Sequence, residues 1–82
     1  LFRSLGKIYG ELGRYEESIR AYSRALEIDP KEPNLYYGRA MARFHKSEYD
    51  KAWADVHKAE SLGLTIDAEF LADLREASGR DE

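Results

Sequence analysis

A pattern of apolar and small residues recurs in this sequence at an interval of 34 residues, as the step from Tyr15 to Tyr49 illustrates. At nearly every apolar position the two copies have residues of similar size, whereas the residues at the polar positions differ between the copies. Further matched pairs are Phe2 with Tyr36, Gly6 with Ala40, Ser18 with Ala52, Ile19 with Trp53, Tyr22 with Val56 and Ala25 with Ala59. A repeat of this length indicates stacked supersecondary units, each of which is unable to bury its apolar face alone.

The stretch from residue 15 to residue 28 has the pattern of an amphipathic helix. Its apolar or small residues fall three or four positions apart, which places them on one helix face. They are Tyr15, Ser18, Ile19, Tyr22, Ala25 and Leu26. Glu16 precedes Arg20 by one turn, in the order that stabilises a helix. Pro30 marks the end, because proline lacks the N–H of the helical ladder and disfavours helical geometry in the residue before it.

The same reasoning predicts five helices and no strand. We expect the helices at residues 1–11, 15–28, about 34–46, 49–61 and about 68–77, with turns near 12–14, 29–33, 46–48 and 63–67. Pro33 suits the first position of the third helix. Gly63 suits a left-handed cap after the fourth helix, and Asp67 suits the N-cap of the fifth. The sequence therefore predicts an all-α fold of two antiparallel helical hairpins and an end helix.

The first copy carries a recognisable family motif. It reads Phe2-x-x-Leu5-Gly6-x-x-Tyr9, then Ser18-x-x-x-Tyr22-x-x-Ala25, then Pro30. This copy closely resembles the tetratricopeptide repeat (TPR), whose pattern is W-x2-L-G-x2-Y, A-x3-F and P at the same period. The second copy is looser, with Arg39 and Arg43 where the pattern has Leu and Tyr, and Leu64 where it has Pro. The resemblance covers about residues 1–64.

The resemblance implies a single domain over residues 1–82, built as a right-handed superhelical stack of antiparallel hairpins. Repeat 1 would span residues 1–32, repeat 2 residues 33–66, and a C-terminal capping helix residues 67–78. Gly6 would then lie where two helices approach closely. The residues expected to face the second helix from the first are Phe2, Leu5, Ile8, Tyr9 and Leu12.

Two residues of the second copy invite a functional interpretation but fit structural roles. Trp53 aligns with Ile19 on a packed face, so we expect it in the core. Arg39 replaces an apolar residue; its stem can lie along apolar surface while its guanidinium reaches an acid or a tyrosine face.

Motifs for catalysis, metal binding or cofactor binding are not found. His45 and His57 lie twelve residues apart on different predicted helices, without cysteines or a His-Glu-x-x-His spacing. The glycines form no phosphate-binding loop, and the serines lie outside the contexts that activate a nucleophile. Glu16 and Glu17 point to different helix faces. We expect a non-enzymatic protein without a cofactor or metal.

Net charge and hydrophobicity argue against two classes of partner, nucleic acids and membranes. A net charge of −3 argues against nucleic-acid binding, which requires a basic surface. No apolar run is long enough to span a bilayer, so no membrane partner is expected. The acidic residues concentrated after residue 60 suit a solvated end. Because the sequence begins at Leu1 rather than methionine, we expect a segment of a longer protein. No signal peptide is visible, and we expect a cytoplasmic location.

Stacked hairpins curve, and their first helices line a concave surface. The resemblance implies that this surface binds a segment of another protein. The residues predicted to face this groove are Arg3, Lys7, Asn34, Tyr37, Met41, Phe44, His45, Leu71 and Arg75. Tyr37 is the strongest contact candidate, and the basic flank favours a peptide with an acidic residue beside an apolar anchor. Phe44 and Met41 are alternatively packing residues.

One branch of the resembled family uses Lys, Asn and Arg to clamp the C-terminal carboxylate of a chaperone. This chain has Gly38 where that branch has Asn, and Ala68 and Ala72 where it has basic residues, so we expect no such clamp. The alternative function is architectural: a spacer or self-association element, which would form a weak homo-oligomer. Two repeats and one helix fall below the three repeats that a stable array usually needs.

Overall fold

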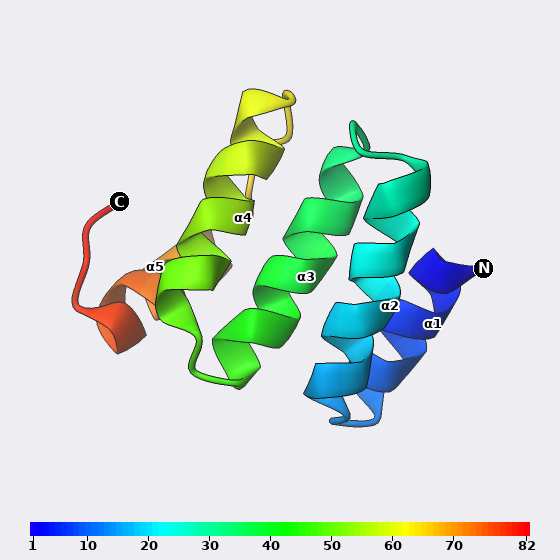
Figure 1. Ribbon diagram of the computed structural model, residues 1–82. Helices are drawn as coiled ribbons and strands as arrows, with labels where there is room; N and C mark the ends of the chain where they lie inside the picture. Colours follow the sequence, from blue (N-terminus) through cyan, green and yellow to red (C-terminus); the bar gives the residue numbers. More distant parts are fainter.

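A computed structural model describes the whole chain, residues 1–82, and contains five helices and no strand (Figure 1). The helices are α1 (Phe2–Glu11), α2 (Tyr15–Ile28), α3 (Pro33–His45), α4 (Tyr49–Ser61) and α5 (Ala68–Ser78). The predicted all-α fold is confirmed, and each observed helix boundary lies within one residue of its predicted position.

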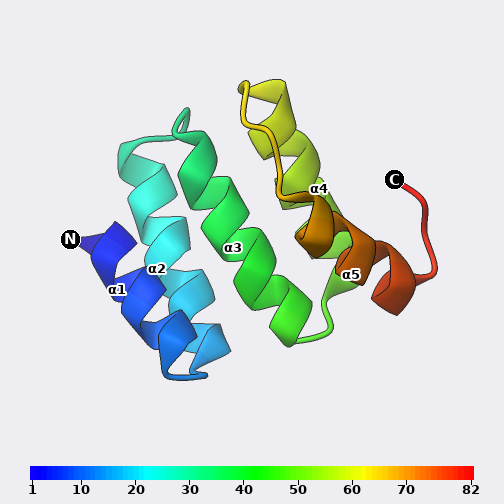
Figure 2. The same ribbon diagram turned by 180° about the vertical axis from the view of Figure 1, so that it is seen from behind.

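The helices pack as two hairpins that share a central contact. α1 packs against α2, α3 packs against α4, and α2 also packs against α3. Figure 2 shows α1, α3 and α5 toward one side of the molecule, with α2 and α4 behind them. The first helices of the two hairpins therefore form one layer together with the end helix.

Local sequence explains where the helices begin and end. Gly13 and Ser47 occupy equivalent points of the two hairpin turns, and both have positive φ angles, of 77° and 63°. Such angles suit glycine and are uncommon for other residues. Asp67 caps α5 as predicted, because its carboxylate accepts a hydrogen bond from the Phe70 N–H at 3.1 Å. Gly63 adopts the predicted positive φ after α4.

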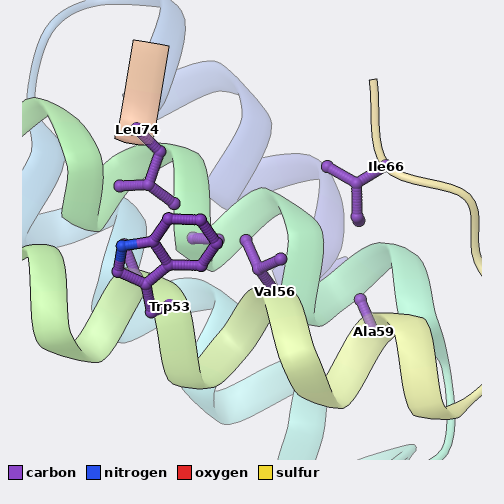
Figure 3. Close-up of a cluster of buried hydrophobic side chains, with 7 residues drawn as sticks. Trp53, Val56, Ala59, Ile66 and Leu74 are labelled. Carbon is purple, nitrogen blue, oxygen red and sulfur yellow. The ribbon is translucent and has the colours of Figure 1, made fainter. Parts of the chain in front are cut away.

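The larger hydrophobic cluster lies between α3, α4 and α5. Its seven buried residues are Ala40, Ala52, Trp53, Val56, Ala59, Ile66 and Leu74. Trp53 points from α4 toward Leu74 of α5, as Figure 3 shows. The Trp53 side chain is 1% exposed, and its indole Nε1–H donates a hydrogen bond to Ser78 Oγ at 3.0 Å. The core assignment of Trp53 is thus confirmed.

The connection from α4 to α5 differs from the proline-containing connection between the repeats. It turns at Gly63 and then runs back along α4 before α5 begins (Figure 2). Leu64 donates its backbone N–H to the Ala59 carbonyl at 3.1 Å, and Ile66 is buried in the cluster. An apolar segment therefore fills this side of α4, and it also positions the start of α5.

A buried ion network joins α3 to α4. The Arg39 guanidinium donates two hydrogen bonds to the Asp55 carboxylate, at 2.8 and 2.9 Å, and a third to Ser23 Oγ of α2 at 3.1 Å. Arg43 donates to the same carboxylate at 2.7 Å. The Arg39 guanidinium also lies 5.7 Å from the centre of the Tyr36 ring. The predicted structural role of Arg39 is confirmed.

The packing predicted for α1 is only partly correct. Phe2, Leu5 and Tyr9 are half-buried as expected. Ile8 and Leu12, which were expected to face α2, are 49% and 64% exposed, so that prediction is wrong. Ile8 lies about a quarter of a turn away from the face that Phe2, Leu5 and Tyr9 share, and Leu12 follows the end of α1, in the hairpin turn.

Candidate binding groove

The approach of α1 and α3 is governed by the ring of Tyr22, which reaches out from α2. A Cβ added at Gly6 of α1 would lie 2.8 Å from this ring, and one added at Gly38 of α3 would lie 2.4 Å from it. Both distances are shorter than side-chain packing allows. The two glycines therefore admit the Tyr22 ring between α1 and α3, and burial raises the pKa of its hydroxyl.

Ser18 fixes α1 against α2 at the same level. Its hydroxyl donates a hydrogen bond to the Gly6 carbonyl at 2.7 Å, and both residues are buried. The TPR pattern has alanine at the position of Ser18. Because alanine has no hydroxyl, the Ser18–Gly6 hydrogen bond is specific to this sequence. It holds the α1 backbone against α2 beside the Tyr22 ring.

A hollow of about 280 Å³ opens between α1 and α3, with α2 beneath it. Its lining residues are Gly6, Lys7, Gly10, Glu11, Tyr15, Ser18, Tyr22, Gly38, Met41, Ala42 and His45. We call this hollow the groove. Met41 contributes apolar surface and is 39% exposed. The lining has three glycines, of which Gly6 and Gly38 lie against the Tyr22 ring, so the floor consists of this ring and the backbone at Gly10.

Three of the predicted site residues meet in this groove: Lys7 from α1, and Met41 and His45 from α3. The His45 ring stacks on the Tyr15 ring of α2, with ring centres 4.8 Å apart and an angle of 12° between the planes. Lys7 and Glu11 stand one turn apart along α1. The groove thus combines an apolar wall, a cation, an anion and an aromatic pair at its edge.

Tyr37 and Phe44 lie in a different environment, between α3 and α5. Each packs edge-on against the Phe70 ring, with ring centres 5.6 Å apart. Phe44 also contacts the rings of His45 and Tyr49. Tyr37 is half-buried, and this burial raises the pKa of its hydroxyl. Leu71 is half-buried against the same core.

The remaining predicted residues lie at the margins. Arg3 is exposed and borders a second hollow, of about 360 Å³, with Leu1 and Ile28. Asn34 is exposed, and its side-chain amide donates to the Glu32 carboxylate at 3.2 Å. Arg75 of α5 is exposed. None of these three residues, nor Tyr37, Phe44 or Leu71, lines the groove.

The sequence alone missed several contributors to the groove. Glu11, Tyr15 and Ser18 line it, yet none of them was predicted as a site residue. Tyr15 was assigned to the packed face of α2, and it does contact a neighbour, but that neighbour is His45 at the groove edge. The repeat spacing signals which face a residue occupies, but it does not indicate where two helices leave space between them.

The chain contains no group of three or more His, Cys, Asp or Glu residues arranged to hold a metal ion. None of the five helices combines the length and the hydrophobicity that a membrane crossing requires.

The family model of the TPR repeat matches residues 6–47, just over half of the chain. This chain belongs to the tetratricopeptide repeat family. Repeats of this family mediate protein–protein interactions.

Known relatives match over part of the chain. Mouse RNA polymerase II-associated protein 3 is 31% identical over 65 residues, which are 79% of this chain and 10% of that protein. Tetratricopeptide repeat protein 36 of Caenorhabditis elegans is 39% identical over 49 residues, covering 60% of this chain and 27% of that protein. The DnaJ homolog subfamily C member 3 homolog of Dictyostelium discoideum is 43% identical over 44 residues, covering 54% of this chain and 9% of that protein. The chain thus corresponds to a small part of each relative. No solved structure matches it.

Proposed function

We propose that this chain is a non-enzymatic module that binds a peptide segment of another protein in the groove between α1 and α3. The observation that carries the proposal is the hollow of about 280 Å³ with Met41 exposed on its wall. Exposed apolar side chains grouped in a concave site favour binding, because a ligand removes their surface from water. The family's general role in protein interaction supports the same conclusion.

The lining defines the chemistry of the peptide. An apolar side chain enters the hollow beside Met41, over the Tyr22 ring that fills the space at Gly6 and Gly38. An acidic residue next to this anchor pairs with Lys7. Glu11 lies one turn away and disfavours a second acidic residue on that side, because like charges repel there. We therefore propose a peptide with one acidic residue adjacent to one apolar anchor.

Other predicted residues extend this contact surface. Tyr37, Phe44 and Leu71 already pack between α3 and α5, so we propose that only their exposed edges touch a ligand. Tyr37 suits this role because a tyrosine has a large apolar face and little side-chain entropy to lose. Arg3, Asn34 and Arg75 would act as peripheral polar contacts. We expect an affinity near micromolar, about −8 kcal/mol, and a reduced affinity in high salt because the charges are exposed.

Capture of partner proteins by the immobilised chain, followed by comparison of variants, tests this proposal. Met41→Glu and Lys7→Glu should weaken capture at least tenfold, since the first places a charge on the apolar wall and the second reverses the cation. Arg20→Glu is the matched control: Arg20 is exposed on α2 and lies outside the groove.

The control and groove variants must behave differently for the proposal to hold. Loss of capture with Arg20→Glu, with full capture by both groove variants, would place the interaction on the opposite side of the molecule. Tyr37→Ala distinguishes the extended surface from the groove itself. It should weaken capture less than Met41→Glu, since Tyr37 does not line the hollow.

A further inference from the structure

Tyr22 is a buried polar side chain of the groove without a hydrogen-bond partner in the chain. It is 8% exposed and lines the groove. Its hydroxyl makes no hydrogen bond with another residue. The other buried hydroxyl of the lining, that of Ser18, donates to the Gly6 carbonyl at 2.7 Å. Because most buried polar side chains have a partner, the Tyr22 hydroxyl is a hydrogen-bonding group left available to a ligand.

The Tyr22 hydroxyl can be reached from the groove. At Gly6 the nearest atoms of the ring are Cδ2, Cε2 and Cγ, whereas at Gly38 they are Cζ, Cε1 and the hydroxyl oxygen. The ring therefore extends from α1 toward α3 and ends in its hydroxyl beside Gly38. The only fully enclosed side-chain polar atom without a partner in the chain is Arg43 Nε. The Tyr22 hydroxyl oxygen is thus open to solvent, on the side where this side chain lines the groove.

Packing alone does not require this hydroxyl. The 34-residue shift places Val56 at the position that matches Tyr22, and Val56 is fully buried. An apolar side chain can therefore fill the equivalent space in the second hairpin. Repeat 1 instead has a side chain that adds a polar atom at the floor of the groove, which is where a ligand would be bound.

The chemistry of the floor indicates what the hydroxyl binds. Burial raises the pKa of Tyr22 above 10.0, so the hydroxyl is protonated at neutral pH and can donate a hydrogen bond. Backbone carbonyls inside the surrounding helices already accept hydrogen bonds from their own helix. A ligand that covers the hydroxyl without offering an acceptor leaves a buried donor unpaired, which lowers its affinity. The groove therefore disfavours a purely apolar ligand.

The acceptor that suits this position is a main-chain carbonyl. The apolar anchor of the proposed peptide lies beside Met41 and over the Tyr22 ring. In any peptide, the polar groups nearest an apolar side chain are the N–H and C=O of the same residue, and only the C=O accepts. The acidic side chain of the peptide is drawn instead to Lys7, which is exposed.

We propose that the Tyr22 hydroxyl donates a hydrogen bond to the main-chain carbonyl of the peptide residue whose apolar side chain enters the groove. This inference rests on the peptide binding proposed above and adds the chemical class that the floor selects, an amide-bearing chain rather than a hydrocarbon. Tyr22 then has two roles: its ring fills the space between Gly6 and Gly38, and its hydroxyl determines which ligands are accepted.

A titration with a defined probe tests this assignment. The probe is a short synthetic peptide, acetylated and amidated, with one glutamate followed by one leucine between glycine and serine residues. Its dissociation constant is measured from amide shifts of the isotope-labelled chain. Tyr22→Phe keeps the ring and removes only the hydroxyl, so it should weaken binding about threefold to tenfold, the usual effect of one hydrogen bond. Its urea midpoint at neutral pH should stay that of the wild type, because the hydroxyl has no partner in the chain.

Tyr36→Phe is the matched control. It removes a hydroxyl that donates to the Pro30 carbonyl at 2.9 Å, outside the groove. This variant should bind the probe as the wild type does. Equal affinities of the wild type and Tyr22→Phe for the probe would overturn the proposal.

A second form of the probe identifies the acceptor. Replacing the amide that follows leucine by an ester makes the leucine carbonyl a weaker acceptor. The ester should weaken binding to the wild type more than binding to Tyr22→Phe, and this difference isolates the contact between hydroxyl and carbonyl. Replacing glutamate by glutamine should weaken binding to both proteins by the same factor. An ester effect that is equal in both proteins, or a glutamine effect that disappears in Tyr22→Phe, would overturn the assignment to the main-chain carbonyl.

Met41→Glu separates failure of this inference from failure of the proposed function. If Met41→Glu weakens binding of the probe and Tyr22→Phe does not, the groove is the binding site and the role given to the Tyr22 hydroxyl is wrong. If the probe leaves the amides of Gly10 and His45 unmoved in the wild type, peptide binding in the groove is itself refuted, and this inference with it.

Discussion

The ring of Tyr22 occupies the space that a side chain at Gly38 would need: a Cβ there would lie 2.7 Å from the Tyr22 hydroxyl oxygen and 2.4 Å from Cζ. Gly38 is also the position where the chaperone-binding branch of the family has asparagine. Asparagine does not fit at this position for a packing reason, because repeat 1 places the large ring of Tyr22 between α1 and α3. Repeat 2 has the smaller Val56 at the matching position, together with Ala40 in place of Gly6.

Gly38→Ala should therefore destabilise the chain by about 1–3 kcal/mol, the usual cost of overpacking a core. Chemical denaturation gives the free energy of unfolding. Gly10→Ala is the matched control, since its Cβ would meet only Ser18 Oγ at an ordinary 3.5 Å, and a helical glycine costs about 0.5–1 kcal/mol relative to alanine. The control should be neutral or stabilising. In a Tyr22→Leu background, Gly38→Ala should cost clearly less, and an equal cost in both backgrounds would refute this explanation.

Asp55→Ala should be among the most destabilising substitutions on α4. The Asp55 side chain is 4% exposed and accepts hydrogen bonds from both Arg39 and Arg43. Removing it leaves two guanidinium groups without their anion in a mostly buried site, which costs about 3–5 kcal/mol. Asp50→Ala, on the exposed first turn of the same helix, is the control and should cost far less. The measurement is the midpoint of chemical denaturation. Similar denaturation midpoints for the two variants would mean that water already screens the Arg39–Asp55–Arg43 network.

Leu74→Ala should loosen α5 selectively. Leu74 is fully buried against Trp53, and it is the only buried residue of α5. Truncating a buried leucine costs about 2–5 kcal/mol. Hydrogen exchange should show faster exchange of α5 amides, with those of α1 and α2 little changed. Glu76→Ala, on the exposed side of α5, should leave exchange as in the wild type. Uniform acceleration across all five helices would show instead that α5 unfolds only with the rest of the chain.

Alkaline pH should weaken the fold through Tyr22. Burial raises the pKa of this hydroxyl above its ordinary value of 10.0, so the unfolded chain ionises first as the pH rises. The stabilisation is fully present below pH 10.0 and is lost as the pH rises through the higher folded-state pKa. Urea midpoints measured between about pH 9 and pH 11 should fall less for Tyr22→Phe than for the wild type. Tyr37 shifts in the same direction, so Tyr22→Phe should reduce the fall without abolishing it. Parallel curves for wild type and variant would contradict the assignment to Tyr22.

The sequence predicted the fold well because each helix carries local signals. Proline at 30 and 33, glycine at 63 and the cap at Asp67 all act within one turn of the chain, so their effects can be read without knowing the packing. Trp53 was also predictable, since the 34-residue repeat aligned it with an apolar position. The burial of Asp55 was not predictable in this way. Its partner Arg39 lies 16 residues away, and only the packing of α3 on α4 brings them together.

The groove was predicted less completely, for a related reason. The resemblance to the TPR family implied that Lys7, Met41 and His45 face the groove, and all three line it. Helix periodicity placed Tyr37 and Phe44 on one stripe with Met41, yet Phe70 of α5 packs against both. Periodicity gives the direction of a side chain but not the position of the next helix. Likewise, Ile8 and Leu12 were placed against α2 on apolar character alone, and the structure turns them outward.

The central claim, that the groove between α1 and α3 is the peptide-binding surface, is tested most directly by nuclear magnetic resonance. A peptide derived from a captured partner would be titrated into the isotope-labelled chain while backbone amide shifts are followed. The claim predicts that the largest shifts occur at Lys7, Gly10, Met41 and His45, whose side chains or backbone line the groove. Shifts centred on the exposed residues Arg20, Arg24 and Lys51 of α2 and α4, with the groove amides unmoved, would contradict it.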